Sequence, residues 1–357
     1  MKKLLIIFLL VVLALPVSFY KNVNFSLANA SSAYSEIVME VKSGRVLHEN
    51  NARTKKFMAS TTKILTAIVV IENCNLDDLV TVTADTVGVE GSSIYLETGE
   101  KITVRELLYG LMLRSGNDCA ETLAKYCSGN NKKFAELMNE TALKIGAKNS
   151  NFVNPHGLHD DNHYTTAYDL ALISCYAISN KVFKEIVSTK SINISNSNHD
   201  YVRHLINKNK MLDEFDGTTG IKTGFTKKAG RCLVTSCQRN GMELVCVVLN
   251  CPPMWEQSKQ LLTTCFNEYI NYKLVESDYI IDFLDVENSN IKCGVYVKSD
   301  VVLPLDSYEK ENLIIEYDLP TKLNLPIKKD QEIGNIKIMC KNNLIFNAKI
   351  YTIIEVK

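Results

Sequence analysis

The chain has 357 residues, a length typical of two domains, and 46% of its residues are hydrophobic and 22% charged. Lysine and arginine together number 40, and aspartate and glutamate also number 40, so the formal net charge is zero. This balance argues against a nucleic-acid-binding surface, which needs a basic stripe, and against a long disordered polar chain.

The N-terminus has the pattern of a secretory signal. Two lysines precede twelve unbroken apolar residues, 4–15, a run too short for a membrane span of about 20 residues. Pro16 ends the run, and a small-x-small cleavage sequence follows at residues 28–30. We expect residues 1–30 to be removed, which leaves 37 basic against 40 acidic residues. The alternative is an uncleaved anchor, which would supply the chain's only contact with a membrane.

The following part alternates between strand and helix patterns. Residues 35–41 and 45–48, joined by a turn, predict a β-hairpin. Apolar spacing predicts helices after Ser60 and at 103–113, 118–127, 132–146, 166–178 and about 255–272. Further strand-like runs lie at 79–82, 232–237 and 243–250. A helical block is therefore inserted between strands.

From about residue 276 the pattern changes. Short apolar or alternating runs are separated by Asn, Asp, Lys and Gly. This sequence pattern predicts a small, sandwich-like all-β domain over residues 276–357. The chain ends directly after a strand pattern, without an amphipathic helix to lie on a membrane. We expect a protein that is released or loosely held.

The first chemical motif is Ser60-Thr61-Thr62-Lys63, at the start of a predicted helix. Ser at i and Lys at i+3 lie on one face of a helical turn. A serine hydroxyl becomes a nucleophile when a base takes its proton, and a lysine can be that base if burial or a nearby cation lowers its pKa. The structural alternative is an N-cap serine with an exposed lysine.

The second motif is Ser115-Gly116-Asn117, between two apolar helices. The hydroxyl can relay a proton, and the amide can bind a peptide carbonyl or N–H group. The composition is also that of an ordinary helix–helix turn.

The third motif is Lys222-Thr223-Gly224, at the start of a predicted strand. It offers a positive charge, a hydroxyl and a residue without a side chain, beside which a substrate backbone can approach closely. The alternative is a turn at a strand edge with a solvated lysine.

The three motifs are informative because of their order. Ser60 and Ser115 are 55 residues apart, and Asn117 and Lys222 are 105 apart. S-x-x-K, S-x-N and K-T-G in this order characterise the serine penicillin-recognising enzymes. With the segments 154–158 (NPHGL) and 165–171 (TTAYDLA), they make residues 34–272 resemble the D-alanyl-D-alanine carboxypeptidases, the low-molecular-mass penicillin-binding proteins.

The resemblance implies an α/β (α+β) fold: a transpeptidase/β-lactamase-like domain with a five-stranded antiparallel sheet and a helical subdomain, followed by a C-terminal β module. The implied division is a signal peptide at 1–30, a catalytic domain at 31–275 and a β domain at 276–357. The implied partners are peptidoglycan stem peptides and β-lactam antibiotics, outside the cytoplasmic membrane. No metal or organic cofactor is implied.

The resemblance also implies a role for each motif residue. Ser60 would attack the carbonyl between two D-alanines, with Lys63 as its general base. Ser115 would relay the proton to the leaving D-alanine, and Asn117 would hold the substrate amide. The remaining residues would bind the substrate: Lys222, Thr223, Gly224 and Phe225, with the backbone N–H groups of Ser60 and Phe225 as the oxyanion hole.

One departure from the family concerns an arginine beyond the K-T-G strand, which often helps to hold the terminal carboxylate. Residues 240–275 contain no arginine, and Arg231 would substitute only if its side chain points into the site. The histidines and aspartates of residues 156–163 could suggest a metal site, but we expect them to serve backbone hydrogen bonding. We expect the thiol of Cys119 to be buried and inert.

Other functions remain as alternatives to the carboxypeptidase. A D,D-endopeptidase would use the same machinery on cross-links. A class A-like β-lactamase would need a glutamate in an E-x-x-L-N pattern, and no glutamate of this chain has it. A penicillin-binding sensor, the non-enzymatic alternative, would need a membrane span, and the sequence has no candidate beyond residue 30.

Overall fold

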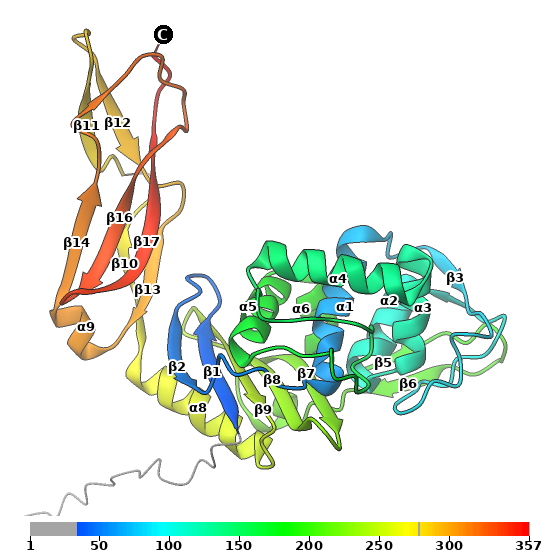
Figure 1. Cartoon of the computed structure of the whole chain (residues 1–357). Helices are drawn as coiled ribbons and strands as arrows, with labels where there is room; N and C mark the ends of the chain where they lie inside the picture. The colour runs from blue at the N-terminus through cyan, green and yellow to red at the C-terminus, as the bar shows by residue number, and fades with distance from the viewer. Residues whose placement is uncertain (1–33, 278, 357) are drawn as a thin grey trace, which may run out of the picture. The chain divides into compact units, whose positions relative to one another are not determined.

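The computed structural model describes residues 34–277 and 279–356, so the predicted signal peptide lies outside the described residues. The hairpin prediction is confirmed by strands β1 (Ser35–Glu40) and β2 (Val46–Asn50). These strands join β7 (Thr218–Thr226), β8 (Gly230–Arg239) and β9 (Met242–Leu249) in one sheet of order β2-β1-β9-β8-β7 (Figure 1). Every neighbouring pair is antiparallel, as the resemblance implied.

The sheet is covered on both faces, which explains why its central strand reads as a continuous apolar run. Helix α5 (Ala167–Ile178) packs on β1 and β9 from one side, and α8 (Met254–Glu268) packs on β8 and β9 from the other (Figure 1). Successive residues of β9 therefore enter two different cores. Its residues Val245, Val247 and Leu249 pack with the helical block, and its residues Leu244, Cys246 and Val248 pack with α8.

The helical block lies between β2 and β7 in the chain. It contains α1 (Lys63–Asn73), α2 (Val104–Tyr109), α3 (Asn117–Ser128), α4 (Asn131–Ile145) and α6 (Lys181–Ser188). Local signals explain its boundaries: Thr103 and Glu106 form a capping box at the start of α2, and Gly129 and Gly146 end α3 and α4 in the left-handed conformation.

Two local predictions were wrong, and one strand pair was not predicted. The unpredicted pair joins β5 (Ser191–Ile194) to β6 (Arg203–Ile206). The K-T-G motif lies inside β7 and not at the start of a strand. The helix expected to reach residue 272 ends at Glu268, because the chain turns directly into β10 (Ile270–Val275).

The C-terminal part is all-β, as predicted. Its main sheet has six strands in the order β14-β16-β17-β12-β11-β15. These strands are β11 (Asp282–Val286), β12 (Lys292–Tyr296), β14 (Leu313–Asp318), β15 (Lys322–Leu323), β16 (Glu332–Cys340) and β17 (Asn343–Thr352). A separate pair joins β10 (Ile270–Val275) to β13 (Val301–Leu305), and both strands contribute to this domain's own apolar core. The division at residue 276 stays a prediction.

Candidate active site

Ser60 lies on a short 3-10 turn, Ala59–Thr62, which runs directly into α1. The turn begins with Ala59 at φ 49°, a left-handed conformation that is uncommon for a residue with a side chain. Two hydroxyls hold it: Thr61 Oγ1 donates to Met58 O at 2.7 Å, and Thr62 Oγ1 donates to Ala59 O at 2.8 Å. The serine is thus fixed at the N-terminal end of the buried helix that carries Lys63.

The side chain of Lys63 is fully buried and has three polar neighbours. Its Nζ donates to His156 O at 2.6 Å and to Asn117 Oδ1 at 2.7 Å, and it lies 3.1 Å from Ser60 Oγ. Burial holds the pKa of Lys63 well below its usual value, and the positive charge of Lys222 lowers it further. Both effects favour a neutral amine beside the serine hydroxyl.

The Ser115-Gly116-Asn117 segment contributes the Asn117 side-chain amide, one of the polar neighbours of the Lys63 amine. Ser115 adopts the left-handed conformation, φ 65°, after the π-helical turn Gly110–Arg114, and α3 starts at Asn117. Asn117 accepts from Lys63 through Oδ1 and donates through Nδ2 to Glu90 O at 2.5 Å, which fixes the orientation of its amide. Among the described residues no hydrogen bond joins Ser115 to Ser60 or Lys63.

Gly116 is required by its surroundings. A Cβ at this position would lie 2.7 Å from Asp118 Oδ1 and 2.9 Å from Cys119 Sγ. Asp118 is itself buried and accepts hydrogen bonds from the backbone of Ile94 and Leu96, which fixes the 92–96 loop beside the site. The Cys119 thiol is buried, as predicted, and burial raises its pKa well above the usual value.

Strand β7 forms the edge of the sheet and faces the turn Ala59–Thr62, which carries Ser60. Burial, together with the positive charge of Lys208, lowers the pKa of Lys222 to about 7. A Cβ on Gly224 would lie 3.1 Å from both Ser60 N and Met58 O, so only glycine lets the strand approach the serine this closely. Thr223 is half-buried and Phe225 is exposed on either side of this glycine. The strand's backbone therefore lies beside the Ser60 N–H group.

Two of the three histidines in residues 156–163 accept backbone hydrogen bonds, as predicted, while His159 lies 3.3 Å from the Asp161 carboxylate. His163 Nδ1 accepts from Val153 N at 3.1 Å, so Nε2 carries the proton and donates to Thr62 Oγ1 at 2.7 Å. His156 Nδ1 accepts from Leu158 N, and its Nε2 lies 3.0 Å from Glu121 Oε1. In the described part of the chain no group of three or more His, Cys, Asp or Glu side chains is arranged to hold a metal ion.

Arg231 does not take the place of the missing arginine. Its side chain is exposed, and its guanidinium carbon lies 5.8 Å from the centre of the exposed Phe225 ring.

Lys208 is a further cation, which the sequence patterns did not reveal. Its Nζ donates to Ser92 Oγ at 3.0 Å. Its positive charge lowers the pKa of both Lys63 and Lys222. Nothing local marks an isolated lysine in a polar stretch as part of a site.

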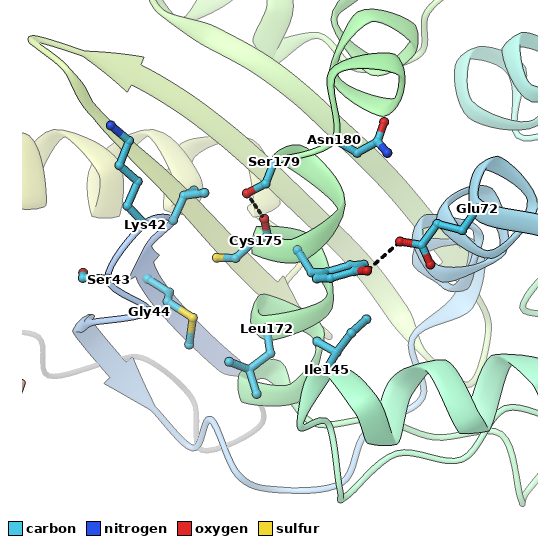
Figure 2. A pocket seen from close by; sticks show the side chains of 12 residues that line it. Lys42, Ser43, Gly44, Glu72, Ile145, Leu172, Cys175, Ser179 and Asn180 are labelled. Atoms are coloured by element: carbon cyan, nitrogen blue, oxygen red, sulfur yellow. Dashed lines mark hydrogen bonds between the residues drawn. The ribbon is translucent and has the colours of Figure 1, made fainter. Parts of the chain in front are cut away.

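A separate hollow of about 560 Å³ lies between the β1–β2 turn and α5 (Figure 2). Its polar contacts are internal: Tyr176 Oη donates to Glu72 Oε1 at 2.6 Å, and Ser179 Oγ donates to Cys175 O at 2.8 Å. It contains no residue of the three motifs.

Over residues 34–277 and 279–356, no helix has the length and apolar character needed to cross a bilayer.

Comparison with known proteins gives matches along both domains. Residues 22–252 match the family described as D-alanyl-D-alanine carboxypeptidase, and residues 269–357 match the family described as penicillin-binding protein 5, C-terminal domain. The chain is 32% identical to the D-alanyl-D-alanine carboxypeptidase DacC of Escherichia coli, over 87% of this chain and 80% of that protein. It is 29% identical to DacF of Bacillus subtilis, over 86% and 81% of the two chains.

Solved structures agree with these matches. Penicillin-binding protein 5 from Haemophilus influenzae superposes with a TM-score of 0.81 at 28% identity, covering 91% of this chain and 97% of that one. The likeness therefore extends over both domains.

Proposed function

Because the chain belongs to the D-alanyl-D-alanine carboxypeptidase family, we propose that it removes the terminal D-alanine from peptidoglycan stem pentapeptides through an acyl-enzyme on Ser60. The observation that carries the proposal is the buried amine of Lys63, 3.1 Å from Ser60 Oγ. Its lowered pKa makes it a base that is neutral at a far lower pH than an exposed lysine.

In the acylation step, Lys63 takes the Ser60 proton as Oγ attacks the carbonyl between the two D-alanines. The negative charge that develops on the carbonyl oxygen is bound by the N–H groups of Ser60 and Phe225. A Cβ added to Gly224 would lie 3.1 Å from Ser60 N, which supports this pairing because it places the β7 backbone beside the serine N–H. Ser115 then passes the proton to the departing D-alanine nitrogen, and the C–N bond breaks.

The residues around Ser60 and Lys63 would bind the substrate. Lys222 supplies positive charge and Thr223 a hydroxyl for the terminal carboxylate, while the amide of Asn117 holds the substrate amide. Lys208 adds a further positive charge, which supplements a carboxylate site that lacks an arginine. Water then hydrolyses the ester, and the steps use no metal or organic cofactor.

The same serine would be acylated by penicillins, whose β-lactam carbonyl would occupy the place of the scissile carbonyl. An exported enzyme of the cell wall fits the signal pattern of residues 1–30, with catalytic residues 31–275 and a β domain at 276–357. Through trimming of stem peptides it would affect cross-linking and thereby cell shape.

The test is release of D-alanine from diacetyl-Lys-D-Ala-D-Ala by the purified chain without residues 1–30. We expect steady turnover by the wild type and by Ser128→Ala, a matched serine at the end of α3, and none by Ser60→Ala. A wild type that releases no D-alanine would overturn the proposal. Hydrolysis of cross-linked dimers to monomers at a similar rate would instead assign an endopeptidase.

A further inference from the structure

A hollow of about 450 Å³ is lined by residues that the proposed mechanism does not use. Its walls come from three separate segments: residues 55–57 before the turn Ala59–Thr62, the 161–164 loop, and the turn between β7 and β8. Phe57, which lines it, is three residues before Ser60, and Ala229, on the opposite wall, is four residues after Phe225. The hollow is therefore joined through the chain to both donors of the proposed oxyanion hole.

The lining of this hollow is positively charged. Three lysines contribute to it, at positions 55, 56 and 228, against one carboxylate, that of Asp161. The Asp161 side chain is 91% exposed and lies 3.3 Å from His159. Among the described residues, Lys55 and Lys228 make no ion pair, and Lys55 Nζ is 4.2 Å from the ring centre of Tyr164. Two ammonium groups at the hollow are thus available to an anion.

The direction of β7 relates this hollow to the substrate. The proposed carboxylate site is at residues 222–223 and the proposed oxyanion donor at Phe225, so the acyl part of the peptide is directed onward, towards the turn that carries Lys228. An extended peptide advances about 3.3 Å per residue. Lys228 is three residues after Phe225, so a peptide that runs alongside the chain needs two or three residues upstream of the cleaved bond to reach this turn.

We propose that this hollow is a subsite for a carboxylate carried by the substrate two or three residues before the cleaved bond. The inference rests on the proposed function, since the substrate's orientation comes from it. Peptidoglycan stem peptides provide such a group in a γ-linked D-glutamyl residue, whose α-carboxylate is free in some peptides and amidated in others. The lysines of the hollow would favour the free carboxylate.

The experiment compares two peptides that differ in this group alone: acetyl-L-Ala-γ-D-Glu-L-Lys(acetyl)-D-Ala-D-Ala and the same peptide with the α-carboxylate as an amide. We expect wild-type kcat/KM to be about three- to tenfold higher for the acid, mainly through KM, and the preference to decline at high salt. Lys55→Gln/Lys228→Gln should bring the ratio to about one, while Lys148→Gln, an exposed lysine outside the hollow, should leave it unchanged.

The possible outcomes separate the two proposals. Equal kcat/KM for both peptides, or a preference that survives in the double variant, would overturn the subsite and leave the carboxypeptidase reaction standing. Cleavage of neither peptide by the wild type would overturn the proposed function, and the subsite with it. The amidated peptide also controls for folding, because the double variant should cleave it at the wild-type rate.

Discussion

Lys63 Nζ donates to Asn117 Oδ1 at 2.7 Å while it lies 3.1 Å from Ser60 Oγ. A neutral amine has two N–H bonds and one lone pair. Asn117 Oδ1 and His156 O are both pure acceptors, so they take the two N–H bonds and leave the lone pair for the Ser60 hydroxyl. Asn117 thereby orients the base in addition to its proposed contact with substrate.

Asn117→Asp should slow penicillin acylation at pH 7 by at least about tenfold. A carboxylate beside the buried amine favours the ammonium form and raises the pKa of Lys63, so less of the base is neutral. Asn73→Asp, which makes the same change at an exposed position on α1, the helix of Lys63, should acylate normally. Equal rates for wild type and Asn117→Asp across pH would contradict this role.

The pH dependence of acylation should depend on Lys222. The active form has a neutral Lys63, so the rate falls as pH drops through the pKa of Lys63. Because the Lys222 charge lowers that pKa, Lys222→Gln should move the acid limb of the profile to higher pH, apart from any loss of overall rate. The second-order rate constant of acylation, followed from pH 5 to 10, measures this. An unmoved limb would show that burial alone sets the pKa.

Gly224→Ala should reduce acylation about 10²-fold or more with a small change in stability. Its methyl group would lie 3.1 Å from Ser60 N and Met58 O, which displaces an oxyanion donor. Gly294→Ala meets side-chain carbon at the same distance, 3.1 Å, in the C-terminal domain and serves as the matched control. Stopped-flow acylation and thermal unfolding of both variants test the difference; an active Gly224→Ala would place the oxyanion elsewhere.

His163 should make the domain less stable in mild acid. Burial lowers its pKa to about 3, against about 6.5 in the unfolded chain, so below pH 6.5 the unfolded state binds the extra proton. Its contribution is full above pH 6.5 and declines as pH falls towards 3, by about 2 kcal/mol between pH 7 and pH 5.

Urea unfolding of the wild type and His163→Gln at these two pH values measures this contribution. The variant should be less stable at pH 7 but should lose about 2 kcal/mol less between pH 7 and pH 5 than the wild type. His159→Gln, an exposed imidazole in the same loop, is the control and should keep the wild-type slope. If the free energy of unfolding changes equally with pH in all three proteins, His163 is not the acid-sensitive group.

The sequence predicted the residues that meet around Ser60 because their side chains carry the chemistry. Lys63, Asn117 and Gly224 were expected from their motifs, and each contacts Ser60 or its neighbours. The acceptor provided by His156 is a backbone carbonyl, which any residue type could supply, so no side-chain pattern identifies it. Lys208 acts through space on Lys63 and Lys222 and has no motif of its own.

The fold was predictable where burial leaves a periodic pattern. The long helices and the apolar strand β9 are of this kind. The pair β5–β6 was missed because exposed polar positions such as Asn193 and His204 alternate with its few buried ones. The start of strand β7 was predicted too late in the chain, because its glycines allow close approach to the turn Ala59–Thr62 and weaken the strand pattern.

The most direct test of the account is the intact mass of the protein after incubation with benzylpenicillin. The account predicts a mass increase equal to one benzylpenicillin in the wild type, located on the peptide that contains Ser60, and no increase in Ser60→Ala. An adduct that persists in Ser60→Ala, or that maps to another residue, would contradict the assignment of Ser60 as the nucleophile.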